Sequence, residues 1–131
     1  MTQTTANTTP STPSPEERQR AWEAYAVIWK LEGERAKKQA CETALADSCV
    51  YTDPDTQRHG WDELVDYMLE FHDQVPGGHF VTTEFRTHRD RSIAIWNMVG
   101  GDGTVLGNGV SYGEYDEQGK VKTMTGFFDT P

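Results

Sequence analysis

The chain has 131 residues, of which 35% are hydrophobic and 25% charged, and its formal net charge is −9. This length and composition are typical of one globular domain. The negative charge argues against nucleic acid or an anionic membrane as a partner, because both attract positively charged proteins. No apolar run approaches the roughly 20 residues that a membrane-spanning helix requires.

The N-terminal residues 1–13, MTQTTANTTPSTP, are rich in Thr, Ser and Pro. They lack the basic start and the apolar middle of a secretory signal. Because so few of them are apolar, we expect a flexible tail, followed by one domain over residues 14–131.

The first helix is predicted to begin at Ser14, because Ser14 and Glu17 have the spacing of a capping box and Pro15 suits the first turn. Its inner face carries residues at i, i+3, i+4 and i+7: Trp22, Tyr25, Ala26 and Trp29. This face is unusually aromatic. Gly33 is expected to break or bend the helix.

A second helix is predicted over about residues 34–46, and a short strand over about residues 49–52. A residue before proline is held extended, so the chain should leave this strand straight at Asp53. A third helix should begin near Gly60 and end at the PGG sequence of residues 76–78.

The two cysteines, Cys41 and Cys49, form neither a CxxC motif nor a zinc-binding pattern. We interpret them as buried thiols in a reducing, cytoplasmic compartment. A disulfide between them is the open alternative.

Four longer strands complete the chain, joined by the hairpin sequences HRDR, GGDG and DEQG: about 79–87, 92–99, 104–115 and 120–128. Helices followed by a meander of strands indicate an α+β fold. We expect a cone-shaped, mostly antiparallel sheet that wraps around the three helices and encloses a pocket. Gly107, Gly109 and Gly113 should bend or bulge the third long strand.

This order of elements resembles the nuclear transport factor 2-like (NTF2-like) superfamily, and more narrowly its SnoaL-like and ketosteroid-isomerase-like members. The matching motifs are short: YTDP, HG before an aromatic residue, a Trp in a middle strand, DG in a hairpin, and the closing GKVKTMTGFFD. The resemblance spans residues 15–130 and implies a homodimer. Because this fold carries enzymes of several kinds and also binding proteins, it does not by itself define the function.

Asp53 is the first candidate catalytic residue. It is similar to the proton-shuttling aspartate of ketosteroid isomerases, which works beside an oxyanion hole made of a Tyr and a protonated Asp. A base that removes a proton next to a carbonyl must reach an apolar cavity and still ionise. The structural alternative is that Asp53 only forms a turn.

Two further residues are candidates for the oxyanion hole. Ser111 falls where the family has the protonated Asp, and a hydroxyl there is a weaker donor. The second donor is predicted to be Tyr25, through its hydroxyl, or Trp29, through its indole N–H. The alternative is that these side chains belong to the core.

The predicted pocket lining follows from strand alternation and from the resemblance. Alternation places Ser111, Gly113 and Tyr115 on one face of their strand, and Ala94, Trp96 and Met98 on one face of theirs. The predicted substrate-binding residues are Trp29, Tyr67, Trp96, Met98, Tyr115 and Phe128. An aromatic lining favours a flat or polycyclic apolar ligand.

No metal site is expected, because His59, His72, His79 and His88 lack ligand spacing. We favour a structural role for His88, beside a hairpin. No cofactor is expected either, because the sequence contains neither a phosphate-binding loop nor a GxSxG motif.

The leading hypothesis is a cofactor-independent acid–base enzyme, an isomerase or polyketide-type cyclase, that acts on a small apolar carbonyl compound. One alternative is a dehydratase or epoxide hydrolase on the same fold. Another is a non-catalytic module for ligand binding or dimerisation.

Overall fold

The computed structural model describes residues 13–129, so the predicted N-terminal tail lies outside the described residues, apart from Pro13. The elements in chain order are α1 (Pro15–Ala26), η2 (Val27–Trp29), α2 (Glu34–Ala44), β1 (Leu45–Thr52), β2 (Gln57–His59), α3 (Gly60–Gln74), β3 (His79–His88), β4 (Arg91–Val99), β5 (Val105–Tyr115) and β6 (Val121–Phe127). None of the helices in this part of the chain is long and apolar enough to cross a membrane.

The predicted start of α1 is confirmed. The Ser14 hydroxyl accepts from the backbone N–H of Glu17 at 3.1 Å, and the Glu17 carboxylate accepts from the Ser14 N–H at 2.7 Å. These reciprocal bonds satisfy two backbone donors that a helix start otherwise leaves unpaired. α1 ends at Ala26 and one 3₁₀ turn, η2, brings Trp29 into the core.

The predicted boundary between the second helix and the first strand is wrong by a few residues. α2 ends at Ala44, and β1 already begins at Leu45 instead of Cys49. Leu45 is fully buried and pairs with Val121 of β6, so tertiary pairing draws it out of the helix.

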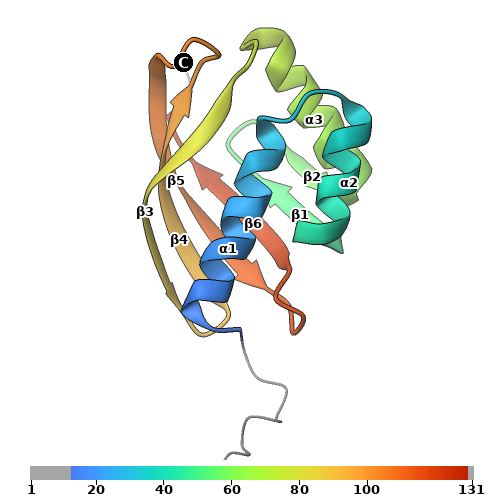
Figure 1. Cartoon of the computed structure of the whole chain (residues 1–131), viewed down its shortest axis with the longest axis vertical. Coiled ribbons are helices and arrows are strands. Elements are labelled where there is room, and N and C mark those ends of the chain that lie inside the picture. Colours follow the sequence, from blue (N-terminus) through green and yellow to red (C-terminus); the bar gives the residue numbers. More distant parts are fainter. Residues whose placement is uncertain (1–12, 130–131) are drawn as a thin grey trace, which may run out of the picture.

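The six strands form one sheet in the order β2-β1-β6-β5-β4-β3. β1 and β6 are parallel, and the other neighbouring strands are antiparallel. The sheet curves around the helices, with α1 lying along its concave face and α2 and α3 beside it (Figure 1). The prediction of an α+β cone is therefore confirmed.

The curvature coincides with breaks in the strand register. β3 is irregular between Thr82 and Glu84, and β4 against β5 between Met98 and Val99. Gly107 pairs with Met98 at the second break, as expected of a glycine in a bent strand.

The outer face of the sheet carries exposed apolar side chains. Ile95 pairs with Val110, and Val110 pairs with Phe127, so the three lie in one row. Ile95 and Phe127 are 41% and 56% exposed. The homodimer expected from the family resemblance stays a prediction.

Lys37 is a buried cation that the sequence reading did not single out. Its ammonium group donates to the backbone oxygens of Ile28 and Trp29, at 2.9 and 3.2 Å, and so caps the end of η2. Burial lowers the pKa of Lys37 to about 8, although the negative charge of Glu32 acts in the opposite direction. Lys37 thereby holds the turn that carries Trp29.

The Lys37→Met variant should lose a pH-dependent contribution to stability. The folded pKa is about 8 and the ordinary value is 10.5, so between these values the unfolded chain binds more protons than the folded protein. Wild-type stability should therefore rise relative to the variant, by about 1–2 kcal/mol between pH 7.5 and pH 9.5. Urea unfolding at both pH values measures this difference, and an unchanged difference would contradict the assignment.

Candidate functional site

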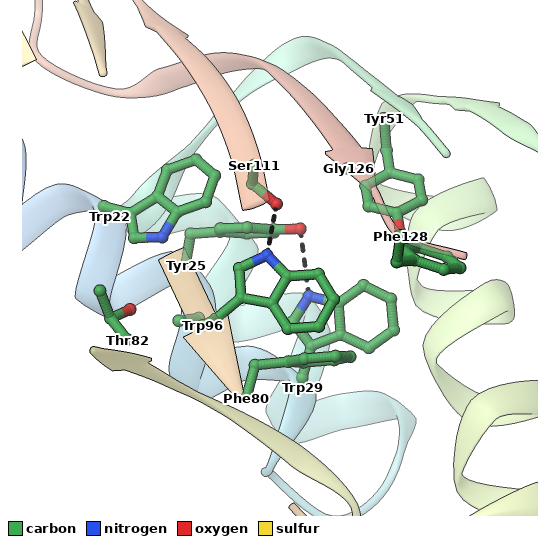
Figure 2. A pocket seen from close by; sticks show the side chains of 11 residues that line it. Trp22, Tyr25, Trp29, Tyr51, Phe80, Thr82, Trp96, Ser111, Gly126 and Phe128 are labelled. Carbon is green, nitrogen blue, oxygen red and sulfur yellow. Dashed lines mark hydrogen bonds between the residues drawn. The ribbon is translucent and has the colours of Figure 1, made fainter. Parts of the chain in front are cut away.

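Two adjoining cavities lie between the helices and the concave face of the sheet. The outer cavity has a volume of about 340 Å³ and the inner one about 40 Å³. They share five side chains, all aromatic: Trp29, Tyr51, Phe80, Trp96 and Phe128. Figure 2 shows the ring-lined inner cavity.

Asp53 follows β1 directly and forms a turn with one of its carboxylate oxygens. Oδ1 accepts from the backbone N–H groups of Asp55 and Thr56, at 2.8 and 3.0 Å. The backbone N–H of Asp53 donates to the Thr56 oxygen at 2.9 Å, which closes the turn. Asp53 therefore does form a turn, as the structural alternative predicts, but it uses only one of its two carboxylate oxygens for this.

The other oxygen of Asp53 is held by two tyrosines. Oδ2 accepts from the hydroxyls of Tyr51 and Tyr67, at 2.6 and 2.7 Å. Asp53 is only 8% exposed, and it lines the outer cavity. A carboxylate has about four acceptor sites, so these four donors use its full capacity.

Both tyrosines beside Asp53 remain protonated donors. Burial raises the pKa of Tyr51, and nearby Tyr25 and Asp53 raise it further. Burial and the hydrogen bond to Asp53 raise the pKa of Tyr67. The guanidinium of Arg58 lies 4.8 Å from the centre of the Tyr67 ring and acts in the opposite direction.

The inner cavity is lined by two hydroxyl groups that each accept from a tryptophan. The Trp29 indole N–H donates to the Tyr25 hydroxyl at 3.1 Å, and the Trp96 N–H donates to the Ser111 hydroxyl at 2.9 Å (Figure 2). Burial raises the pKa of Tyr25, which therefore stays protonated. Each hydroxyl accepts one bond and keeps its own proton to donate.

The hydrogen bond between Trp29 and Tyr25 distinguishes the two predicted donors. The single N–H of Trp29 is already engaged, whereas the O–H of Tyr25 is not used in any hydrogen bond between the described residues. Of the two predicted donors, Tyr25 therefore keeps a proton to donate, and Trp29 does not.

Gly126 of β6 lies between Asp53 and Ser111. A Cβ placed on Gly126 would be 3.7 Å from the Ser111 hydroxyl and 3.8 Å from Cβ of Asp53. The Ser111 hydroxyl and Cβ of Asp53 therefore both lie next to Gly126, which has no side chain to fill the space beside them. Residues from β1, β5 and β6 meet at this point.

The predicted lining residues differ in where they lie. Trp29, Tyr67, Trp96, Met98 and Phe128 line the outer cavity. Tyr115 lines neither cavity, and its hydroxyl contacts the Ser92 hydroxyl at 2.8 Å. Trp22 lies against Gly113, where a Cβ would approach its ring to 2.7 Å, and Trp22 itself lines the inner cavity.

Sequence reasoning missed two aromatic residues that both cavities share, Tyr51 and Phe80. Tyr51 lies two residues before Asp53 on an alternating strand, which places the two side chains on the same face. That signal was available in the sequence. The place of Phe80 depends on how β3 wraps around α1, which periodicity cannot reveal.

The histidines make local contacts. His72 and His79 contact the backbone oxygens of Gly78 and Gly77, at 3.1 and 3.0 Å. Within residues 13–129, no three His, Cys, Asp or Glu side chains gather as a metal site would require.

Comparison with known proteins identifies the family. The SnoaL-like domain family matches residues 34–124, most of the chain, so the protein belongs to this family. No curated protein matches the sequence.

Solved structures show the same fold. A "putative isomerase" of the SnoaL-like family from Agrobacterium tumefaciens is 20% identical, with a TM-score of 0.80, covering 88% of this chain and 99% of its own. A "putative SnoaL-like polyketide cyclase" from Jannaschia sp. is 12% identical, with a TM-score of 0.71 and coverages of 89% and 90%. An NTF2-like protein of unknown function from Cytophaga hutchinsonii is 11% identical, with a TM-score of 0.64 and coverages of 86% and 89%. The predicted family and NTF2-like fold are both confirmed.

The Gly109→Ala variant should be destabilised, because Gly109 lets the Trp96 ring cross β5. A Cβ at Gly109 would lie 2.5 Å from the Trp96 ring and 2.7 Å from the backbone oxygen of Phe127. We expect a loss of about 1–3 kcal/mol in the free energy of unfolding. The matched control is Gly107→Ala on the same strand, where the nearest atom is 3.9 Å away. Equal stability of the two variants in urea unfolding would contradict this role of Gly109.

Proposed function

We propose that this protein is a cofactor-independent acid–base enzyme, an isomerase or polyketide-type cyclase, acting on a small apolar carbonyl compound. The observation that carries the proposal is a buried carboxylate in one cavity beside two hydroxyls with free protons in the adjoining one, the two cavities sharing a wall of aromatic rings. The names isomerase and polyketide cyclase, carried by two structurally similar proteins, agree with this chemistry.

The two cavities suit different parts of such a substrate. The inner volume of about 40 Å³ admits a group of a few atoms, and the hydroxyls of Tyr25 and Ser111 line it. The carbonyl oxygen would enter there and accept a hydrogen bond from each hydroxyl. The rings of the substrate would occupy the outer volume of about 340 Å³, beside Asp53.

In the proposed reaction Asp53 removes a proton from the carbon next to the carbonyl. The electron pair of that C–H bond forms an enolate, whose oxygen is stabilised by the O–H groups of Tyr25 and Ser111. In an isomerase, Asp53 returns the proton to a different carbon. In a cyclase, the enolate carbon attacks a second carbonyl, whose oxygen then takes the proton.

The hydrogen bonds of Asp53 impose one condition on this reaction. Since all four acceptor sites are used, a lone pair becomes available only when one donor turns away. Tyr67 is the more movable of the two tyrosines, because it is half-buried at the outer cavity, whereas Tyr51 is 7% exposed. We infer that substrate entry displaces the Tyr67 hydroxyl from Asp53.

The same observation favours a second candidate, a non-catalytic binding module. A carboxylate with four satisfied donors is also what a purely structural network requires. In that case the two cavities would hold a ligand without chemistry. The two functions differ in whether Asp53 is needed for turnover.

The Asp53→Asn variant should lose catalysis of proton exchange. β-Tetralone, a small ring ketone, is a suitable probe, and NMR in D₂O follows the exchange of its protons next to the carbonyl. We expect a fall of about 10²-fold or more, because an amide cannot act as the base. The control is Asp66→Asn, an exposed acid on α3 that lines neither cavity. If the wild-type protein exchanges no faster than buffer, or Asp53→Asn keeps the wild-type rate, the binding module is the better description.

Tyr25→Phe and Ser111→Ala should each slow this exchange by about 10²-fold, because each removes one donor to the enolate oxygen. Thermal shift by β-tetralone should change little, since the rings still fill the outer cavity. Tyr115→Phe and Ser92→Ala are matched controls, a buried Tyr and Ser whose hydroxyls contact each other outside both cavities. A similar loss of rate in the controls would show that the effect is structural.

A further inference from the structure

Among the described residues that line the outer cavity, all the charged ones are negative. Three carboxylates line it: Asp53, Asp55 and Asp129. Among the described residues that line it, none is Lys, Arg or His. Asp53 is buried, so its charge is screened by solvent less than the charges of Asp55 and Asp129, which are exposed at the mouth.

Arg58, a cation beside this wall, is already engaged. Arg58 lies over the ring of Tyr67 but does not line the cavity. Its guanidinium pairs with the Glu70 carboxylate at 3.5 Å and donates to the Glu63 backbone oxygen at 3.3 Å. A ligand in the outer cavity therefore meets the three carboxylates without a free positive group in the lining.

The aromatic walls favour positive charge as well. Trp29 contacts Phe71 and Phe80 edge to face, with ring centres 5.5 and 5.1 Å apart, and Phe80 contacts Trp96 in the same manner at 5.0 Å. The face of an aromatic ring is its electron-rich side and attracts organic cations. An anionic group would lose its water here and gain no cation in return. The side-chain donors in the lining include the neutral amides of Gln74 and Asn108 and the hydroxyls of Tyr51 and Tyr67, which already donate to Asp53.

We infer that the outer cavity selects its ligands by charge: it prefers a flat ring compound with a protonated amine, accepts the neutral analogue less well, and rejects the carboxylate. This inference rests on the proposed function and narrows its substrate class. Ring compounds that carry a carboxylate or a phosphate would then be excluded as substrates. The neutral carbonyl group still enters the inner cavity, where the two hydroxyls lie.

Three probes of nearly equal shape test the inference: naphthylmethylamine, naphthylmethanol and naphthoate. At neutral pH the amine is protonated and the acid is ionised. Isothermal titration calorimetry with the full chain should give the affinity order amine, alcohol, acid, with about 10-fold between the first and the last at about 0.02 M salt. The ratio of the amine affinity to the acid affinity should fall by about half or more at about 0.5 M salt, because the exposed carboxylates are then screened.

The double variant Asp55→Asn with Asp129→Asn removes the two exposed charges at the mouth. It should reduce the preference for the amine over the acid by about 3-fold, without changing the affinity of the alcohol. The matched control is Asp66→Asn with Glu42→Gln, which changes the net charge equally but lies away from both cavities. This control should keep the wild-type ratio.

The outcomes separate this inference from the proposed function. If naphthoate binds as tightly as the amine, or the mouth variant keeps the wild-type ratio, the charge selection is wrong while exchange of β-tetralone can still proceed. If β-tetralone is not exchanged but the amine binds best, the cavity selects charge without catalysis. If none of the three probes binds, the inference is overturned, and the exchange of β-tetralone then decides the proposed function separately.

Discussion

The site depends on how the protein satisfies one buried carboxylate. Asp53 receives two backbone N–H groups from its own turn and two hydroxyls, one from β1 and one from α3. A buried charge without such partners is costly, so these donors are what allow Asp53 to remain beside an apolar cavity. The same bonds join the end of β1 to α3 and so fix one wall of the outer cavity.

The two indole–hydroxyl pairs solve a related problem in the inner cavity. A buried N–H needs an acceptor, and Tyr25 and Ser111 provide one each. Because a hydroxyl can accept and donate at once, this pairing satisfies the tryptophans and still leaves two O–H groups for a ligand. Lys37 in turn stabilises the position of Trp29, because it caps the turn that carries this residue.

Glycines, which have no side chain, shape the site as much as the larger residues do. Gly109 allows the Trp96 ring to lie across β5 and reach Ser111, and Gly126 places no side chain against Ser111 and Asp53. Conversely, the bulky ring of Trp22 occupies the space over Gly113 and forms part of the inner cavity wall. The shape of the space therefore depends on the choice of small and large residues at neighbouring positions of a curved sheet.

Local patterns were sufficient to predict most of the secondary structure. The capping box at Ser14 and the Gly-rich hairpins are effects of nearby residues, and they anticipate the start of α1 and the four long strands closely. The end of the first helix was predicted wrongly, because α1 stops at Ala26 and Trp29 lies in the 3₁₀ turn η2, before the expected break at Gly33. Asp53 became a candidate through the resemblance to ketosteroid isomerases, because its local sequence, a carboxylate before a proline at a strand end, predicts a turn equally well. Lys37 was overlooked, although it shares the inner face of α2 with Cys41.

Contacts between distant segments decided the rest. Leu45 joins a strand because Val121 pairs with it, and Phe80 enters the cavity because β3 wraps around α1. Trp29 gives its N–H to Tyr25 because packing brings the two side chains together, and an indole N–H can only donate, so Tyr25 keeps its proton. The sequence by itself determined the elements and the chemical groups available, because both follow from local interactions. Only the tertiary structure decided which groups share a cavity, because that depends on packing between residues far apart in the chain.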